Sequence, residues 1–340
     1  MKSSFVGTDI KPFNEFWMNC KYNALFSIAS YYDPNNKYAS YVNHYSFEHT
    51  NNYKDPSFKL PIIKHAEFSE MLPNFTYSIE NCHFENEENF LEELKQMIRQ
   101  GQLVFLSVNL YSWIPGSFCY QRYHWSHFSL IKGYDEVNNC YLVLDDDMNG
   151  YNEFVVSEDT VVKCFRSSDY FTDRENWPYP IVKLQLHQPL LPYEVTLQTV
   201  QDHARRLVLD IEQFTIDDLW KFDEESELLS NHLDYSVIGV EYFYNRHIAN
   251  VKLFKHLHKH KKINDELFET MLHHAKNLEN GWQTIRNNLM KVKAKLKKSR
   301  NVPRDSIIAE AKLLFENEKL MWQLLVESNE EHFKGGGSHE

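Results

Sequence analysis

The sequence has few glycines and no glycine-rich phosphate loop, so a nucleotide-binding fold is not expected. Only 10 of its 340 residues are glycine, and no loop of the kind that holds phosphate groups ahead of a helix is present. No apolar run approaches the ~20 residues that span a bilayer. The segment Met1–Phe16 lacks the apolar centre of a signal peptide. We therefore expect a cytoplasmic protein with no membrane partner and no cofactor.

Paired cysteines and an excess of positive charge are also missing. The 5 cysteines include no CxxC pair, which is typical of free thiols in a reducing compartment and not of a disulfide framework. The 36 Lys and Arg residues are outnumbered by 48 Asp and Glu, which gives a net charge of −12. An acidic chain repels phosphate backbones, so nucleic acid is not expected as a partner.

The chain changes character near residue 190. The part before it holds every cysteine and short apolar runs separated by Asn, Asp, Gly and Pro, whereas the part after it has helical periodicity and few breaking residues. We expect a first domain over 1–190, an all-α helical domain over 191–333, and a flexible tail over 334–340. The helices expected in the second domain are 194–213, 223–260, 265–299 and 304–331.

The first domain is expected to be α+β with an antiparallel sheet. Apolar residues at i, i+3, i+4 and i+7 from Leu25 predict a helix from Cys20 to Tyr32. A second helix is expected over 87–100. The strands expected after it are 103–110, 127–134, 140–145 and 153–156, and the middle two form a hairpin. Helices followed by a run of strands are the order of an α+β domain.

Cys20 is the cysteine best placed to act as a nucleophile. A thiol reacts as its thiolate, and the unpaired N–H groups and the dipole of a helix N-terminus stabilise that anion. Cys20 stands at the expected helix start, where a backbone N–H can also hold a tetrahedral oxyanion. The other cysteines lack this position, because Cys82 and Cys119 are expected in loops and Cys140 and Cys164 in strand-like runs.

The base for this thiol is expected at His127. This histidine opens a strand, and a strand residue is held rigidly, as catalysis requires. His124, in the loop just before the strand, is the alternative.

The acid that orients the imidazole can be chosen from the register of the hairpin. If Tyr134 lies opposite Cys140, then Asp145 lies on the face of His127 and within reach of its ring. We choose Asp145 for this reason. A register slip of one residue would transfer the role to Asp146.

Each of these residues also has an ordinary structural interpretation. A cysteine in an aromatic-rich segment is commonly a small core residue, and a strand histidine is commonly half-buried and hydrogen-bonded. The run Asp145–Asp147 also fits a solvated turn or a cation site. The catalytic hypothesis depends on the combination of the three positions.

Five segments follow one another in a recognisable order. They are Cys20-Lys-Tyr-Asn-Ala-Leu25, Gly101-Gln-Leu-Val-Phe-Leu-Ser-Val108, Asn109-Leu-Tyr-Ser-Trp-Ile-Pro115, His127-Phe-Ser-Leu-Ile-Lys-Gly-Tyr-Asp135 and Tyr141-Leu-Val-Leu-Asp145. This order resembles the N-terminal domain of the butirosin-biosynthesis protein H family, a branch of the papain-like superfamily. The bacteriocin-leader peptidases, which have the same Cys…His…Asp order, are more distantly similar. The resemblance covers residues 14–165.

The resemblance implies a papain-like fold and a cysteine acyltransferase. An acyl group would pass from the thioester of an acyl or peptidyl carrier protein to Cys20, and an amine acceptor would take it to form an amide, in antibiotic or nonribosomal peptide biosynthesis. His127 would be the base and Asp145 the orienting acid. Asn14 would stand where papain-like enzymes often place a glutamine that stabilises the oxyanion. The alternatives are a hydrolase on the same residues, either a peptidase or a thioesterase, and a non-catalytic binding module that keeps the fold.

Three features of the second domain invite a functional interpretation. The segment Arg286–Arg300 carries five lysines and no acid, which would suit an acidic carrier protein, although such helix faces are usually solvated. The rings of Tyr242–Tyr244 would line a pocket or fill a core. His256 and His260 share a helix face, but the lysines beside them disfavour a cation, so no metal site is expected.

Overall fold

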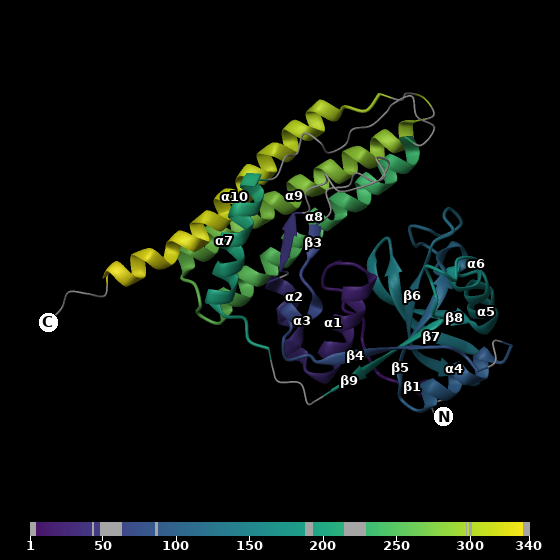
Figure 1. Cartoon of the computed structure of the whole chain (residues 1–340). Coiled ribbons are helices and arrows are strands. Elements are labelled where there is room, and N and C mark those ends of the chain that lie inside the picture. Colours follow the sequence, from purple (N-terminus) through teal and green to yellow (C-terminus); the bar gives the residue numbers. More distant parts are fainter. Residues whose placement is uncertain are drawn as a thin grey trace. The chain divides into compact units, whose positions relative to one another are not determined.

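The structure is a computed structural model (Figure 1) that describes residues 5–42, 44–47, 63–85, 88–187, 193–213, 229–296, 298 and 301–335. The chain divides into two compact units. Unit 1 comprises Met1–Lys37 and Leu72–Tyr193, and unit 2 comprises Tyr38–Met71 and Glu194–Glu340. The division after Tyr193 lies close to the expected boundary, but the stretch 38–71 belongs to unit 2 and not to the first domain in which we expected it.

Unit 1 is built on an antiparallel sheet. Its strand order is β4-β9-β5-β6-β7-β8, and β1 pairs with β6 beside this path. Every ladder in the sheet is antiparallel. The strands are β1 (Phe5–Gly7), β4 (Tyr77–Cys82), β5 (Leu103–Asn109), β6 (Ser126–Asp135), β7 (Cys140–Asp147), β8 (Gly150–Ser157) and β9 (Ile181–Leu186). This confirms the mixed architecture with an antiparallel sheet, and the four expected strands correspond to β5 to β8.

The two helices expected in the first domain are present in unit 1 as its first and its 90–99 helix, and the expected position 87 lies outside the described residues. The other helices of unit 1 were not expected. The full set is α1 (Cys20–Tyr32), η1 (Pro34–Asn36), α4 (Phe90–Arg99), η4 (Leu110–Ser112), α5 (Glu158–Arg166) and α6 (Asp169–Thr172). The run around Cys164, expected to be strand-like, lies in α5 instead. Ser157 caps α5 by accepting a hydrogen bond from the Thr160 N–H, which is the usual role of a serine before a helix. A short apolar run does not by itself distinguish a strand from a helix.

One core of unit 1 lies between the sheet and the helices α4 and α5. It includes Phe90 and Leu94 of α4, Phe165 of α5, and the alternating strand residues Val104 and Leu106 of β5. Alternation places every second residue of a strand on the same face, so the apolar pattern of β5 turns one face of the sheet toward this core.

The face of the sheet that packs against this core also carries polar residues near the start of β6. Val108 lies opposite His127, and Leu106 lies opposite Ser129. Because directly opposite residues share a face, His127 and Ser129 stand on the face that packs against the core. His127 and Ser129 are therefore neighbours of buried apolar side chains on this face of the sheet.

The hairpin of β6 and β7 differs from the expected register near its loop. The residue opposite Tyr134 is Tyr141 and not Cys140. A β-bulge between Ile131 and Gly133 then shifts the pairing by one residue, as a bulge does by adding a residue to one strand. Beyond the bulge the pairing has the register that we expected, so the choice of aspartate stands although the loop pairing was wrong.

Unit 2 consists of long helices and the small elements of the stretch 38–71. The helices expected from periodicity are confirmed within the described residues, although the third ends at Lys295 and the last one continues through positions 334–335, which we expected in the tail. Expected helix positions 223–228, 297 and 299, the Pro-rich junction at 188–192 and the tail residues 336–340 lie outside the described residues. The elements are α2 (Lys37–Val42), β2 (Tyr45–Phe47), β3 (Ile63–His65), α3 (Phe68–Met71), α7 (Leu197–Gln213), α8 (Leu229–Lys259), α9 (Asp265–Lys295) and α10 (Arg304–Gly335). Within the described residues, no helix combines the length and the apolar character required to cross a membrane.

Candidate active site

Cys20 is the first residue of α1, as the sequence predicts. The cap of this helix is Asn19, whose side chain accepts a hydrogen bond of 2.8 Å from the Tyr22 N–H. Cys20 is half-buried. The sulfur therefore stands where the free N–H groups and the dipole of a helix of 13 residues favour an anion.

The loop that leads into Cys20 is fixed by Asn23, which the sequence reasoning missed. Its amide oxygen accepts hydrogen bonds from the N–H groups of Met18 (2.8 Å) and Asn19 (3.2 Å). Its amide nitrogen donates to the carbonyl groups of Phe13 and Phe16, both at 3.0 Å. The side chain is fully buried, so all four bonds form away from water. An asparagine among the mostly apolar residues of this helix was the signal available in the sequence.

His127 is held by the carboxylate of Asp145. Its Nε2 lies 2.9 Å from Asp145 Oδ2, which leaves the other ring nitrogen, Nδ1, for a second partner. The side chain of His127 is 15% exposed and that of Asp145 only 2%. The imidazole thus reaches solvent while the acid behind it does not.

Cys20 also interacts with the ring of His127. Burial disfavours the charged ring, but the charge of Asp145, its hydrogen bond, and a hydrogen bond and charge interaction with the Cys20 sulfur raise the pKa well above its ordinary value. The nucleophile, the base and the acid of the prediction are therefore adjacent. The alternative base His124 is exposed, stacks on Tyr111 at 4.2 Å and lies 3.3 Å from the Asn109 amide, so its contacts are with the loop.

Asp145 is saturated with hydrogen-bond donors. Its Oδ2 accepts the indole N–H of Trp113 at 2.8 Å, its Oδ1 accepts the backbone N–H of Asp146 at 2.8 Å, and the Ser129 hydroxyl is a further partner. Burial opposes ionisation, but the charge of His127 and these hydrogen bonds lower the pKa of Asp145. This carboxyl is therefore a carboxylate that fixes the ring of His127. Trp113, the tryptophan of the segment 109–115, is a supporting residue that the sequence reasoning did not single out.

Asp146 is a second carboxyl group at the site. Trp17, three residues before the nucleophile, donates its indole N–H to Asp146 Oδ2 at 3.0 Å. Ligand-type atoms of His127, Asp145 and Asp146 all lie within 4.8 Å of one another, and no other group of this kind occurs among the described residues. A cation there would displace the bond between His127 and Asp145 and would meet indole N–H groups aimed at the same oxygens. The described contacts of these carboxylate oxygens are thus with N–H groups.

Asn14 is exposed, in the coil between β1 and α1. Among the described residues the structure gives its side chain no hydrogen-bond partner. Its role as an oxyanion donor stays a prediction.

The other four thiols have environments that disfavour a thiolate. Burial is the first cause in each case: it raises the pKa of Cys82 and Cys140, and it raises the pKa of Cys119 and of Cys164 to about 11. Cys82 ends strand β4 and does not lie in a loop, contrary to our expectation. A thiol needs its thiolate form to attack, so the five cysteines are not equivalent.

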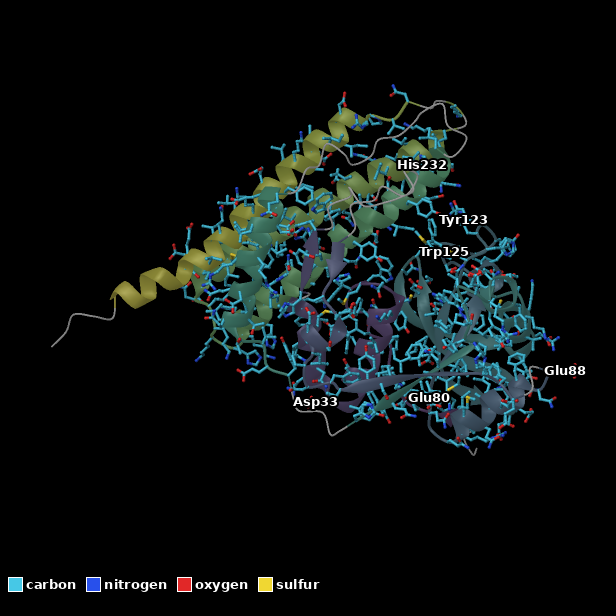
Figure 2. The ribbon with its side chains drawn as sticks, in the orientation of Figure 1. Asp33, Glu80, Glu88, Tyr123, Trp125 and His232 are labelled. Carbon is cyan, nitrogen blue, oxygen red and sulfur yellow. The ribbon has the colours of Figure 1, made fainter. Side chains whose placement is uncertain are left out.

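An aromatic loop borders the site ahead of β6. The charges of His127, Asp146 and Asp145 all act on the Cys119 thiol, which places this part of the loop close to them. Further along, the guanidinium of Arg122 lies 5.0 Å from the ring of Phe118 and 5.3 Å from that of Tyr123. The loop leads to Trp125, which is 45% exposed, and Figure 2 shows Tyr123 and Trp125 on it. An aromatic loop with an exposed tryptophan thus leads directly into the strand that carries His127.

The features singled out in the second domain have mainly structural partners. Phe243 is fully buried and stacks on Trp282 at 4.3 Å, so this ring of the aromatic stripe belongs to the core. His256 packs against His260, while His258 lies 2.8 Å from an Asp265 carboxylate oxygen. The side chains of His256, His258 and His260 therefore do not converge on one point.

The basic segment of α9 is partly neutralised by acids of α8. Arg286 pairs with Glu241, and Lys293 pairs with Asp234. Lys291, Lys295 and Lys298 are exposed, and Lys297, Ser299 and Arg300 lie outside the described residues. Docking of an acidic carrier protein there stays a prediction.

No protein-family model matches the sequence, and no curated protein matches it significantly.

Proposed function

We propose that the protein is a papain-like cysteine acyltransferase that forms an acyl thioester on Cys20 and passes the acyl group to an amine. The observation that carries this proposal is the adjacency of Cys20, His127 and Asp145, with the thiol at a helix N-terminus and the carboxylate bonded to the far side of the ring. A thiol beside a base that is oriented by a third group is the arrangement of nucleophilic catalysis. The order of the sequence motifs adds support, because it resembles that of carrier-dependent acyltransferases.

The residues divide the chemistry of the first half-reaction. His127 takes the thiol proton, and the thiolate of Cys20 attacks the carbonyl carbon of the donor thioester. The N–H groups at the start of α1, with Asn14, stabilise the oxyanion. The bond from the carbonyl to the donor sulfur breaks, and the donor thiol leaves with the proton from His127. Asp145 keeps the ring in position throughout.

In the second half-reaction an amine replaces the cysteine. It attacks the acyl-Cys20 carbonyl, the bond to sulfur breaks, and an amide is released. The aromatic loop ahead of β6, with Phe118 and Trp125, offers apolar surface for an acyl chain and excludes water from the intermediate. A carrier protein as donor, a place in antibiotic or nonribosomal peptide biosynthesis, and a cytoplasmic location are parts of the same proposal.

Intact-protein mass spectrometry tests the proposal. The protein is incubated with short acyl thioesters of pantetheine, and wild type is compared with Cys20→Ala. We expect an adduct of the acyl mass in the wild type that is lost in Cys20→Ala. Cys140→Ala is the matched control, because it removes a half-buried thiol at the far end of β7 and should keep the adduct. An adduct that persists in Cys20→Ala would overturn the assignment.

The products separate the alternatives. An acylated wild-type protein that releases only the free acid when amines are offered would be a hydrolase on the same residues. A protein that forms no adduct and turns over no thioester would be a binding module that keeps the fold.

A further inference from the structure

The two adjacent carboxyl groups of the site have unequal hydrogen-bond environments. An ionised carboxyl accepts about four hydrogen bonds. Asp145 receives donors from His127, Trp113, Ser129 and the backbone, so its capacity is filled. For the carboxyl of Asp146, Trp17 is the one N–H donor that the described residues provide. Asp146 therefore keeps acceptor capacity for a ligand that carries N–H groups.

Asp146 is also the less buried of the two adjacent aspartates. Asp145 is 1% exposed, whereas Asp146 and His127 are both half-buried. Since the ligand-type atoms of these three residues lie within 4.8 Å of one another, a molecule that approaches the imidazole also meets the carboxyl of Asp146. Trp17 holds that carboxyl in place from the segment that precedes Cys20.

The acceptor of the proposed reaction has a chemical requirement at this position. An alkylamine is an ammonium ion at neutral pH, and it attacks a thioester only after it loses a proton. General bases work best when their pKa is near the working pH. Burial, followed by the charge of Asp145, raises the pKa of Asp146 to about 7.

The neighbours of Asp146 include groups that raise its pKa and groups that lower it. Asp145 raises its pKa, and His127 and the Trp17 hydrogen bond lower it. Asp146 also interacts with Cys119 and Tyr151, and burial raises the pKa of both and keeps them neutral at pH 7.

We propose that Asp146 binds the ammonium group of the acceptor and takes its proton when the amine attacks acyl-Cys20. This inference rests on the proposed function and assigns its acceptor as a cationic primary amine. One N–H bond of the ammonium breaks, and its proton passes to the Asp146 carboxylate. The freed lone pair forms the C–N bond, the C–S bond breaks, and His127 carries the second amine proton to the departing Cys20 sulfur. Asp146 then releases its proton to solvent.

Asp146→Asn tests the role with the hydrogen bond of Trp17 preserved, because the amide oxygen still accepts from the indole. Cys20 is first acylated with a short acyl thioester of pantetheine, excess donor is removed, and loss of the adduct is followed by mass spectrometry. Two acceptors are compared at pH 7.5: an alkylamine, which is charged, and hydroxylamine, which is uncharged. Asp147→Asn is the matched control, because it removes a carboxylate charge one residue further along the chain. Asp147 is the last residue of β7, and its carboxylate accepts a hydrogen bond from the Asn149 N–H in the following turn.

The expected result is specific to the second step and to the charged acceptor. In Asp146→Asn, acylation of Cys20 should stay within about twofold of wild type, and transfer to the alkylamine should fall by about 100-fold. Transfer to hydroxylamine should stay within about fivefold, and Asp147→Asn should behave as wild type. Alkylamine transfer in wild type should rise with pH through about 7 as Asp146 ionises, a rise that Asp146→Asn lacks.

Two outcomes would overturn the inference alone. One is alkylamine transfer in Asp146→Asn at the wild-type rate, and the other is an equal loss for both acceptors, which would mean a purely structural role. A wild-type protein that never acquires an adduct on Cys20 would instead overturn the proposed function, and the inference with it.

Discussion

The single hydrogen bond between His127 Nε2 and Asp145 Oδ2 fixes the direction in which the imidazole faces the sulfur. It is 2.9 Å long and lies in surroundings where Asp145 is almost fully buried. A neutral amide in place of the carboxylate would keep the shape but would no longer stabilise the imidazolium. The orientation and the charge of one ring thus depend on one oxygen atom.

Asp145→Asn should therefore slow the acylation of Cys20 strongly. We expect a fall of about 100-fold to 10,000-fold, the range of positioned acid–base groups, measured by quenched mass spectrometry with an acyl thioester. Trp113→Phe is the comparison, because it keeps an aromatic ring at this position and removes the indole N–H whose hydrogen bond Asp145 accepts; it should slow acylation by about tenfold or less. A rate for Asp145→Asn within twofold of wild type would contradict the role.

Asn14 offers a second prediction at this scale. Asn14→Ala should slow acylation by about 100-fold, the typical effect of one oxyanion donor. The melting temperature should not change, because the side chain is exposed and the described residues give it no hydrogen bond. Acylation at the wild-type rate would mean that the N–H groups of α1 hold the oxyanion alone.

The start of α1 is ordered by a residue that lies inside the helix. Asn23 makes four hydrogen bonds to the loop ahead of Cys20, and the Ser27 hydroxyl oxygen accepts a further one of 2.7 Å from the Phe13 N–H. The position of Cys20 thus depends on the polar side chains of Asn23 and Ser27, which the apolar periodicity of the helix does not indicate.

Asn23→Ala should destabilise the protein by about 3 kcal/mol, because it leaves buried N–H and C=O groups without partners. The free energy of unfolding is measured by urea denaturation, with Asn176→Ala as the control. Asn176 is exposed, so its substitution should change the free energy by less than about 0.5 kcal/mol. Equal effects of the two substitutions would show that the network around Asn23 contributes little.

The element scale also shows how much the sequence could predict. The helix that starts at Cys20 and the hairpin that carries His127 followed from periodicity and from turn residues. The bulge between Ile131 and Gly133 did not, because β6 is buried on both faces from Ser129 to Tyr134, so no pattern of buried and exposed side chains marks the extra residue. The helical state of Cys164 depends on the Ser157 cap, which is a stronger signal than the short apolar run we relied on.

For the site, the sequence sufficed to select Cys20, His127 and Asp145 but not their support. Trp17 and Trp113 are far from the aspartates in sequence, and only the folded chain brings their N–H groups to Asp146 and Asp145. Long-range pairs of this kind depend on tertiary packing, which local patterns do not encode.

At the scale of the whole molecule, chain order did not predict which unit holds the stretch 38–71. Part of this stretch is fixed by a buried ion pair of unit 2. Arg246 Nη2 lies 2.7 Å from Glu318 Oε2, and the Tyr45 hydroxyl donates to Glu318 Oε1 at 2.7 Å. The charge of Arg246 outweighs burial and lowers the pKa of Glu318 to about 2. One carboxylate thus links β2 to α8 and α10.

Glu318→Gln should destabilise the protein by about 3–5 kcal/mol, because it leaves Arg246 as an uncompensated buried charge. The readout is the free energy of unfolding from urea denaturation. Glu212→Gln is the matched control: Glu212 pairs with Lys319 at 2.9 Å at the surface, where a pair contributes about 1 kcal/mol or less. If both substitutions have the same small effect, the buried pair does not hold the stretch 38–71.

The most direct test of the account is the rate at which each of the five cysteines is alkylated by iodoacetamide at pH 7, mapped by peptide mass spectrometry in wild type and in His127→Gln. The raised pKa of His127 keeps the imidazolium charged at this pH, and an imidazolium favours the thiolate beside it. Cys20 should therefore react about tenfold or more faster than any other cysteine, and lose that advantage in His127→Gln. A Cys20 that reacts no faster than the other four, or equally fast in both proteins, would contradict the pairing of this sulfur with this imidazole.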